Sequence, residues 1–407
     1  MVETPSSVVI VGAGLAGAKA AEALREADYT GPVTLIGEEA EPPYERPPLS
    51  KGYLQGSAPF DDAVVHPAAW YAEHDVELRR ARVRALHRAG AEVELDDGSR
   101  LGYGALVLAT GSAPRRLPVP GAESALTLRT RSDSDAIRAV FGSGRRLVIV
   151  GAGWIGLEVA AAARQAGTTV TVLESADQPL LRVLGPEVAP VFTALHRDHD
   201  VDLRLGVTVT GIEEGGVRLA DGELVPADAI VLGVGARPRT DLAEAAGLAV
   251  DDDAGGVLVD ATLRTSDPAI WAVGDIASQD HPVLHQRVRV EHWATALNQP
   301  KAAVAALLGG TEAYDRLPYF YSDQFDLGLE YVGYAPPGSY ARVVVRGDVI
   351  GREFVAFWLA SDERLLAAMN VNVWDVVDAV KPVIAGGVPV DPGRLTDPGV
   401  PFSEIGG

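Results

Sequence analysis

Two glycine-rich turns of one pattern recur in this chain and begin 139 residues apart, at Gly12 and Gly151. They read Gly12-Ala13-Gly14-Leu15-Ala16-Gly17 and Gly151-Ala152-Gly153-Trp154-Ile155-Gly156. Each turn follows a short apolar run and precedes an alanine-rich stretch, which is the order of strand, turn and helix in a dinucleotide-binding unit. One such turn alone is weak evidence, because glycine-rich turns are common. Two copies with the same surroundings predict two bound dinucleotides.

The composition is that of a folded protein of several domains, with 47% hydrophobic and 22% charged residues among 407. The chain contains no cysteine. Disulfides, thiolate metal sites, thiol nucleophiles and a redox-active dithiol are therefore excluded. Any redox chemistry must belong to bound cofactors, and we expect no metal.

The net charge of −21 argues against a nucleic-acid partner, because phosphate binding needs a basic surface. No apolar run reaches the 18 to 20 residues that span a bilayer, and the first five residues lack the charged segment of a secretory signal. We therefore expect a cytoplasmic protein without a membrane partner.

The first turn lies in a predicted strand, helix and strand unit. Residues 7–11 are an apolar run typical of a buried parallel strand, residues 15–26 favour a helix, and residues 33–36 favour a second strand. Glu38 follows that second strand, 21 residues beyond Gly17. A carboxylate at this place can accept hydrogen bonds from an adenosine ribose.

The second turn repeats this organisation. A strand is predicted at 146–150, a helix through Gln165 and a second strand at 169–173 that ends at Glu174. A carboxylate there bonds a ribose 2′-hydroxyl and repels a 2′-phosphate. No arginine occurs among Ser175-Ala176-Asp177 to bind such a phosphate. The pattern favours a dinucleotide that lacks the 2′-phosphate.

Further strands that end in glycine turns are predicted at 106–112, 230–235 and 269–275. The glycines would let backbone approach a ligand. From about Tyr319 the character changes, and strands at 342–345, 353–359 and 365–369 with a closing helix at 374–384 predict a third, α+β domain. The Pro/Gly-rich tail at 386–407 has weak periodicity and is expected to wrap the surface.

These features together resemble the FAD-containing, NADH-dependent ferredoxin reductases of bacterial oxygenase systems, and the match runs from Val8 to Leu366. Beyond the two turns it rests on residues 46–51, 109–111, 128–130, 156–158, 265–268, 273–275 and 322–324. The resemblance implies an α/β, glutathione-reductase-like fold with two Rossmann-type nucleotide-binding domains and a C-terminal α+β domain. The implied FAD domain comprises 1–112 and 240–318, the NADH domain 113–239 and the C-terminal domain 319–407.

The resemblance assigns the first turn to FAD. Amides at a helix start suit the diphosphate, and the Glu38 carboxylate would bind the ribose. The resemblance places the Val83 backbone near the adenine, Asp275 on the ribityl hydroxyls and Trp293 against the flavin ring. The residues expected to bind FAD are Gly12, Gly14, Leu15, Ala16, Gly17, Glu38, Arg46, Lys51, Val83, Ala109, Thr110, Gly111, Arg129, Gly274, Asp275, Glu291, His292 and Trp293.

The resemblance assigns the second turn to NADH. The expected contacts are Gly151, Gly153, Trp154, Ile155, Gly156, Glu158, Glu174, Arg182 and Gly235. Lys51 and Glu158 are the implied catalytic residues. The lysine would stabilise the anionic reduced flavin, and a pair with Glu158 would orient the lysine and moderate its charge. His292 is expected to be structural, since hydride transfer needs no proton donor from the protein.

The implied activity passes electrons from NADH through FAD to a ferredoxin that serves a haem monooxygenase or a Rieske dioxygenase. Alternatives of the same fold are an NADH oxidase, a rubredoxin reductase and an NADH-sensing flavoprotein like apoptosis-inducing factor. Ferredoxins are acidic, so Lys301 with Arg287 or Arg289 is the candidate docking patch. The chain departs from the family at Tyr319-Phe320-Tyr321, where Trp-Phe-Trp is frequent, and at Arg239, where asparagine is frequent.

Overall fold

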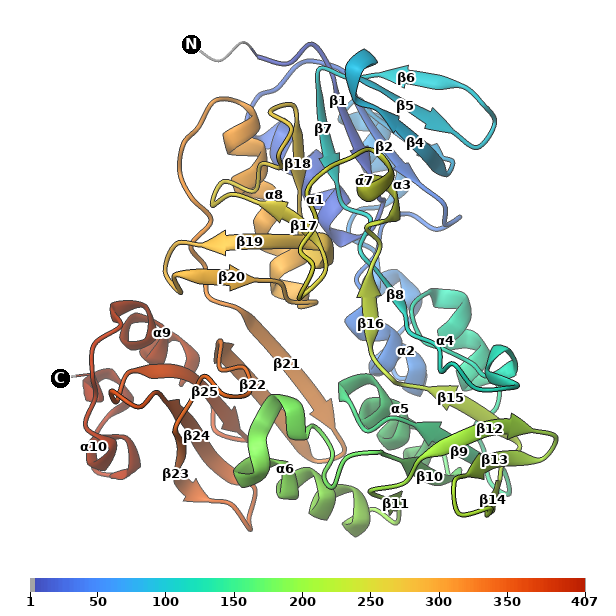
Figure 1. Cartoon of the computed structure of the whole chain (residues 1–407), viewed down its shortest axis with the longest axis vertical. Helices are drawn as coiled ribbons and strands as arrows, with labels where there is room; N and C mark the ends of the chain where they lie inside the picture. Colours follow the sequence, from blue (N-terminus) through green and yellow to red (C-terminus); the bar gives the residue numbers. More distant parts are fainter. Residues whose placement is uncertain (1–3, 407) are drawn as a thin grey trace. The chain divides into compact units, whose positions relative to one another are not determined.

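The computed structural model describes residues 4–406, which form two compact units (Figure 1). The first unit comprises the chain up to Arg46, Phe60–Ala113 and Arg237–Pro318. The second comprises Pro47–Pro59, Pro114–Ala236 and the chain from Tyr319 onward. Of the five N-terminal residues considered for a secretory signal, Met1, Val2 and Glu3 lie outside the described residues.

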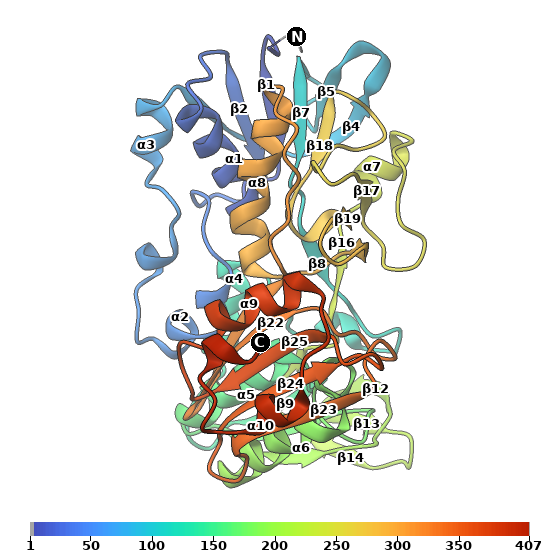
Figure 2. The same ribbon diagram turned by 90° about the vertical axis from the view of Figure 1, so that its left-hand side faces the viewer.

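The first unit is built on a five-stranded parallel sheet in the order β18-β7-β1-β2-β3. Its strands are β1 (Val8–Val11), β2 (Val33–Gly37), β3 (Val76–Arg80), β7 (Ala105–Leu108) and β18 (Ile270–Ala272). Helices α1 (Leu15–Glu26) and α8 (Trp293–Leu307) run beside one another (Figure 2).

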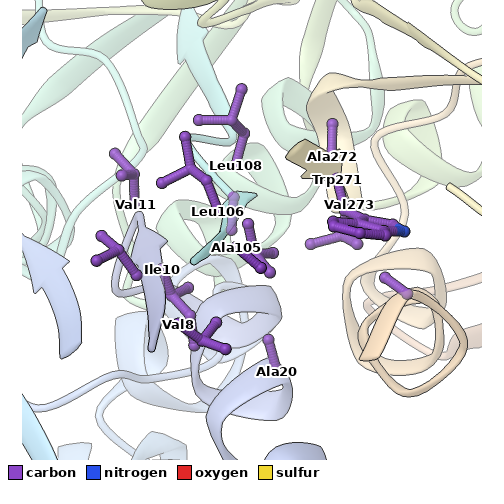
Figure 3. Close-up of a cluster of buried hydrophobic side chains, with 14 of the residues drawn as sticks. Val8, Ile10, Val11, Ala20, Ala105, Leu106, Leu108, Trp271, Ala272 and Val273 are labelled. Atoms are coloured by element: carbon purple, nitrogen blue, oxygen red, sulfur yellow. The ribbon is translucent and has the colours of Figure 1, made fainter. Parts of the chain in front are cut away.

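The core of this unit lies around its central strands (Figure 3). Ile10, Leu106 and Ile270 are completely buried, and every residue of β1 and β7 is buried as well. Helices on a parallel sheet leave no strand face to solvent, which explains why these strands are continuous apolar runs.

Smaller elements complete the first unit. They are the helices α3 (Ala68–Glu73) and α7 (Asp241–Ala245), the antiparallel sheet of β4 (Val83–His87), β5 (Glu92–Leu95) and β6 (Arg100–Gly102), the sheet of β17 (Val257–Val259), β19 (Ala277–His281) and β20 (Gln286–Val288), and the 3₁₀ turns η2 (Phe60–Ala63), η3 (Arg88–Gly90) and η5 (Gly274–Ile276). Strands β8 (Ser112–Pro114) and β16 (Ala236–Pro238) pair where the chain passes between the units.

The second unit contains a four-stranded parallel sheet in the order β11-β10-β9-β15. Its elements are β9 (Arg146–Val150), β10 (Thr169–Leu173), β11 (Asp202–Arg204) and β15 (Ala229–Leu232), with α2 (Gly52–Gln55), α4 (Arg131–Arg138), α5 (Trp154–Gln165) and α6 (Leu181–Asp198), the antiparallel strands β12 (Val209–Glu213), β13 (Gly216–Leu219) and β14 (Leu224–Pro226), and the turns η1 (Pro47–Ser50) and η4 (Ala122–Ser124).

Helix α6 (Leu181–Asp198) is not predicted from the sequence. Gly185, Pro186 and Pro190 lie within it, and such residues normally indicate a helix end. Gly185 has φ 77° and divides the helix at a kink, so that Pro186 begins the longer piece, where proline is tolerated.

The rest of the second unit is an antiparallel sheet in the order β21-β22-β25-β24-β23 with two helices beside it (Figure 2). The elements are β21 (Tyr319–Gln324), β22 (Leu327–Gly333), β23 (Arg342–Asp348), β24 (Glu353–Leu359), β25 (Leu365–Val371), α9 (Val377–Gly386), α10 (Pro392–Thr396) and η6 (Phe402–Glu404). The three predicted strands are confirmed. The closing helix begins at Val377, and the tail contains α10 because Asp391 caps it, accepting a hydrogen bond from the Gly393 amide.

The two parallel sheets and the antiparallel sheet confirm the predicted α/β class with a C-terminal α+β region. The division into three domains stays a prediction. Leu54, Leu157 and Trp358 share one apolar cluster of the second unit, so the segment 47–59 and the C-terminal sheet pack with the region around the second glycine turn. The predicted FAD domain, 1–112 and 240–318, includes this segment 47–59, which belongs to the second unit.

Candidate active site

The two glycine turns lie at equivalent places in the two parallel sheets. Strand β1 lies between β2 and β7, and β9 lies between β10 and β15. In each sheet the chain proceeds outward on one side of the first strand and later returns on the other side. Ligands of such sheets bind at the carboxyl ends of the strands where the order reverses. Gly12 and Gly151 follow these central strands directly.

Packing requires the first and third glycine of each turn. A Cβ atom on Gly12 would lie 2.1 Å from the Ala109 carbonyl oxygen, and one on Gly17 would lie 1.9 Å from the Gly12 oxygen. In the second turn a Cβ on Gly151 would lie 2.5 Å from the Gly233 oxygen, and one on Gly156 would lie 2.1 Å from the Gly151 oxygen. These four positions hold the strand against the helix start.

Packing within the protein does not require glycine at the middle position of either turn. A Cβ on Gly14 would meet no described protein atom within 4 Å, and one on Gly153 would meet only the Gly233 oxygen, at 3.8 Å. Both residues have φ values, −90° and −81°, that other residues also adopt. Glycine at these places therefore leaves room for something outside the protein, as a dinucleotide diphosphate requires.

The helices behind the turns present free amide ends. Gly14 is the N-cap residue of α1 and Gly153 is that of α5, and among the described residues neither helix start has a side-chain cap or an acid in its first turn. The first amides of a helix lack partners within it and carry partial positive charge. The amides after Gly14 and Gly153 are thus suited to an anionic diphosphate, so the residues present fit both expected cofactors.

The two strand-end acids have different surroundings. Glu38 is half exposed, with Arg82 Nε at 3.6 Å and Arg239 Nη1 at 4.0 Å. The carboxylate of Glu174 instead accepts the amides of Ala152, at 2.7 Å, and Ala176, at 2.8 Å. Each carboxylate keeps lone pairs for ribose hydroxyls.

Gly274 and Asp275 are placed beside the first glycine turn. Gly274 has φ 74°, and a Cβ on it would lie 3.3 Å from the Ala16 Cβ. Its amide donates to Gln299 Oε1 at 2.8 Å, and Asp275 is buried. Arg46 pairs with Glu39 and lies near enough to Asp275 to feel its charge. Burial lowers the pKa of Arg46, but the bonds to Glu39 outweigh it and raise the pKa overall.

The segment Glu291-His292-Trp293 leads into α8, which begins only at Trp293. His292 is partly buried, and this burial lowers its pKa to about 4, so the ring is neutral near pH 7. Glu291 accepts a hydrogen bond from Arg289 at 2.8 Å. Burial raises the pKa of Glu45, and a hydrogen bond from Trp293 opposes this shift. These contacts fix the segment in the first unit.

The other residues predicted to bind FAD fall in both units. Val83 begins β4, and Ala109, Thr110 and Gly111 follow β7, where the Thr110 hydroxyl donates to the Arg239 carbonyl oxygen at 2.8 Å. Lys51 and Arg129 belong to the second unit, whereas the remaining predicted FAD residues belong to the first.

Lys51 and Glu158 form an ion pair within the second unit. The Pro-Pro loop forms the short helical turn η1, and Lys51 follows it at the N-cap position of α2, without a side-chain capping hydrogen bond. The Lys51 Nζ atom lies 2.7 Å from Glu158 Oε1. The Glu158 side chain is only 3% exposed and also accepts the hydroxyls of Ser50 and Ser322. Both serines lie in segments that carry the family resemblance, 46–51 and 322–324, but no role is predicted for either from the sequence.

The other residues predicted to bind NADH surround the second turn. Arg182 lies in the first turn of α6, and Gly235, at φ 96°, follows β15. The Trp154 ring packs edge-on against Phe192, with centroids 5.6 Å apart. Ile155 is 43% exposed, which is unusual for isoleucine at a helix start and leaves an apolar surface beside the open glycine.

The three candidate docking residues differ in solvent exposure and in their hydrogen bonds within the protein. Lys301 is 78% exposed and lies 3.2 Å from Glu26. Arg287 donates to the carbonyl oxygens of Val259 and Ser278, and Arg289 is largely covered and paired with Glu291. Lys301 and Arg287 are both exposed to solvent, but only Lys301 lacks hydrogen bonds to backbone oxygens among the described residues.

Residues 6–300 match the pyridine nucleotide-disulphide oxidoreductase family, and residues 319–405 match the reductase C-terminal domain. The chain belongs to the pyridine nucleotide-disulphide oxidoreductases. Members of this family use FAD and NAD(H), and the missing cysteines place this chain outside the disulfide chemistry in the family's name. Within residues 4–406 no cluster of acidic or histidine side chains could hold a metal ion, and no helix is long and apolar enough to cross a bilayer.

Within this oxidoreductase family the chain groups with ferredoxin reductases of oxygenase systems. It is 42% identical to the ferredoxin–NAD(+) reductase component of the anthranilate 1,2-dioxygenase system of Burkholderia cepacia, covering 96% of this chain and 97% of the relative. It is 39% identical to putidaredoxin reductase of Pseudomonas putida, covering 98% and 96%. A crystal structure of the covalent putidaredoxin reductase–putidaredoxin complex superposes with a TM-score of 0.93 at 38% identity, with 98% of each chain covered.

Proposed function

We propose that this protein is an NADH-dependent ferredoxin reductase that supplies electrons to an oxygenase through an iron-sulfur protein. The proposal rests chiefly on the two glycine turns, each with an open middle glycine and a strand-end acid, in a chain without any thiol. Two dinucleotides in one protein without cysteine fit an electron transfer that runs from one bound cofactor to the other.

The related proteins support this choice of partner. One relative is named as the reductase component of a dioxygenase system, and putidaredoxin reductase was crystallised in covalent complex with putidaredoxin. Both relatives match this chain over nearly its whole length. We therefore assign the final acceptor as a ferredoxin that serves a haem monooxygenase or a Rieske dioxygenase.

We assign FAD to the residues at the first glycine turn and NADH to those at the second. In the first unit the amides after Gly14 would hold the diphosphate, Glu38 the ribose and Asp275 the ribityl chain. In the second unit the amides after Gly153 and the Glu174 carboxylate would hold NADH. When bound, FAD supplies the ability to accept a hydride and to release electrons singly.

Lys51 and Glu158 are the residues we assign to the reaction itself. The Lys51 ammonium supplies positive charge where negative charge develops, and Glu158 fixes the position of that ammonium. Glu174 selects the dinucleotide, because its charge repels a 2′-phosphate. The neutral His292 donates no proton to the reaction in this scheme.

Rapid mixing of the purified flavoprotein with NADH, and then with a ferredoxin encoded by the same organism, tests the proposal. We expect flavin bleaching by NADH, little bleaching by NADPH, and rapid recovery of the oxidised spectrum on adding ferredoxin. Faster recovery with oxygen than with any ferredoxin would instead identify an oxidase. We propose the cytoplasm as its location, since NADH is supplied there, and fractionation of cells would test this.

A further inference from the structure

Three donors converge on the Glu158 carboxylate in the second unit. Lys51 Nζ at 2.7 Å and the Ser322 hydroxyl at 2.6 Å both donate to Oε1, and the Ser50 hydroxyl donates to Oε2. Ser50 and Ser322 are 2% and 1% exposed. A carboxylate held at both oxygens by fixed hydroxyls cannot turn about its side-chain bonds.

The hydrogen bonds continue beyond Ser322. Gln324 Nε2 donates to the Ser322 oxygen at 3.1 Å, and Gln324 Oε1 lies 2.9 Å from His196 Nε2. His196 is completely buried, and burial lowers its pKa to about 4, so the ring is neutral near pH 7. Its Nδ1 has no hydrogen bond among the described residues. The single ring proton therefore belongs on Nε2, where Gln324 accepts it.

This arrangement gives the chain of bonds one direction. A serine hydroxyl has one proton to donate. At Ser322 the Gln324 amide already supplies a donor, so the hydroxyl proton is directed to Glu158. Ser50 has a second acceptor, the Pro47 carbonyl oxygen at 3.2 Å, and is less strongly committed. Every described donor from His196 onward thus points toward Glu158.

Four separate parts of the second unit supply this network. Ser50 ends η1, Glu158 lies on α5, His196 lies on α6, and Ser322 and Gln324 lie on β21. The two β21 residues are two positions apart and therefore share a sheet face. Asp323 between them is exposed on the opposite face. The C-terminal sheet thereby contributes directly to the surroundings of the Lys51–Glu158 pair.

We propose that Ser322 and Ser50 are positioning residues for the Lys51–Glu158 pair, with Gln324 and His196 fixing the direction of the Ser322 hydroxyl. A lysine has four rotatable side-chain bonds, so a single carboxylate that could itself rotate would hold its ammonium loosely. With the carboxylate fixed, the ammonium is confined to one place. This inference rests on the proposed function only where it assigns the confined ammonium a role in the reaction. The hydrogen bonds themselves do not depend on that function.

The chain offers a direct measurement of how firmly Lys51 is held, because it contains only four lysines, at positions 19, 51, 301 and 381. We would treat the holoenzyme with limiting acetic anhydride and follow each lysine by peptide mass spectrometry. In the Ser322→Ala variant we expect Lys51 to be acetylated about threefold to tenfold faster, from the loss of a charge-assisted hydrogen bond to its partner. The other three lysines should be unchanged, and Ser322→Thr should restore the slow rate.

Ser134→Ala is the matched control. Ser134 is also a completely buried serine of the second unit, and its hydroxyl donates to the carbonyl oxygen of Leu49, two residues before Lys51, at 2.8 Å. It does not contact Glu158. We expect a similar loss of thermal stability but slower Lys51 acetylation than in Ser322→Ala. Equal acetylation in both variants would mean that the serines only stabilise the fold, and would overturn the inference.

A second readout uses flavin reduction by NADH. If Ser322 acts through Glu158, Ser322→Ala should slow reduction in the wild-type background and have no further effect in a Glu158→Gln background. Additive effects would overturn the inference. Should Ser322→Ala not fold, Ser50→Ala replaces it, with a smaller expected effect. A wild-type protein that NADH cannot reduce would refute the proposed function, whereas unchanged Lys51 acetylation in both serine variants would refute only this inference.

Discussion

The two glycine turns have nearly the same backbone and different side chains around it. The Gly12 amide donates to the Ile36 oxygen and the Gly151 amide to the Leu173 oxygen, both at 2.8 Å. The third glycine of each turn lies against the first in both copies. The two copies therefore share the glycines and backbone hydrogen bonds that packing and diphosphate binding require.

The copies diverge two residues beyond the third glycine. The first turn has Lys19 there, a partly exposed residue that pairs with Glu22 at 2.8 Å. The second turn has Glu158, which is buried and pairs with Lys51. A surface pair of this kind contributes little to stability or chemistry, whereas a buried carboxylate must have a reason to be there. This difference supports our proposal that the first turn holds a cofactor and that the second also carries residues for the reaction.

The largest expected effect separates packing glycines from ligand glycines. Gly17→Ala places a Cβ 1.9 Å from a backbone oxygen, so we expect about 3 kcal/mol or more of lost stability, or no folded protein. Gly14→Ala meets no described atom within 4 Å, and its thermal midpoint should stay near that of the wild type. Its FAD content, read from the flavin absorbance, should fall sharply. A Gly14→Ala protein with full FAD content would show that no ligand approaches this residue.

The next largest effect is expected at the position two residues beyond the third glycine, which is Glu158 in the second turn and Lys19 in the first. Glu158→Gln keeps the shape of the side chain but removes the charge that holds Lys51, and we expect flavin reduction by NADH to slow about 10- to 100-fold. Lys19→Met changes the equivalent position of the first turn and should alter this rate less than twofold. Stopped-flow absorbance of the flavin measures both. Equal losses in the two variants would contradict the division of roles between the turns.

A third effect compares the strand-end acids. Glu174→Ala removes the repulsion of a 2′-phosphate and a charge-assisted acceptor, so kcat/KM for NADH should fall about 10- to 100-fold while NADPH gains relative to NADH. Glu38→Ala should weaken FAD binding and leave the preference for NADH unaltered. Steady-state kinetics with both nucleotides, and an FAD titration, distinguish these results. A reversed pattern would exchange the cofactors between the turns.

The sequence predicted the parts of the fold that local rules determine. The helix at 15–26 and the strands at 146–150 and 169–173 have the predicted bounds, and the second helix ends at Gln165 as predicted. A glycine turn sets where each helix begins, and buried apolar runs set the strands. Helix α6 was missed, since Gly185-Pro186 indicates an end when only neighbouring residues are considered. The resemblance to a known family, rather than any local pattern, brought Lys51 and Glu158 together.

The rest of the site depends on contacts between distant residues. Ser50 and Ser322 lie 108 and 164 positions from Glu158, and no spacing rule connects them. A buried serine also looks the same in a sequence whether it bonds a carboxylate or a backbone oxygen. The assignment of segment 47–59 to the second unit likewise depends on where Leu54 is buried, which periodicity over four helical residues cannot indicate.

The smallest expected effect compares two histidines whose pKa values are lowered, the buried His196 and the partly buried His292. Burial lowers the pKa of His196 in the second unit and of His292 in the first to about 4, from an ordinary value of 6.5. The unfolded chain therefore binds a proton below pH 6.5 that the folded protein refuses until about pH 4. Stability is complete above pH 6.5 and is lost as the pH falls toward 4, by about 1 to 2 kcal/mol per histidine at pH 5.

Replacing either histidine should remove its share of this pH dependence. Thermal unfolding of wild type, His196→Asn and His292→Asn between pH 7 and pH 5 measures the shares. We expect each variant to be less stable than wild type at pH 7, from lost packing, but to lose less of its stability on acidification. The two histidines belong to different units. If the units unfold in separate transitions, each transition should become less dependent on pH in only one of the two variants. Curves parallel to wild type in both variants would show that folding lowers the pKa of neither histidine.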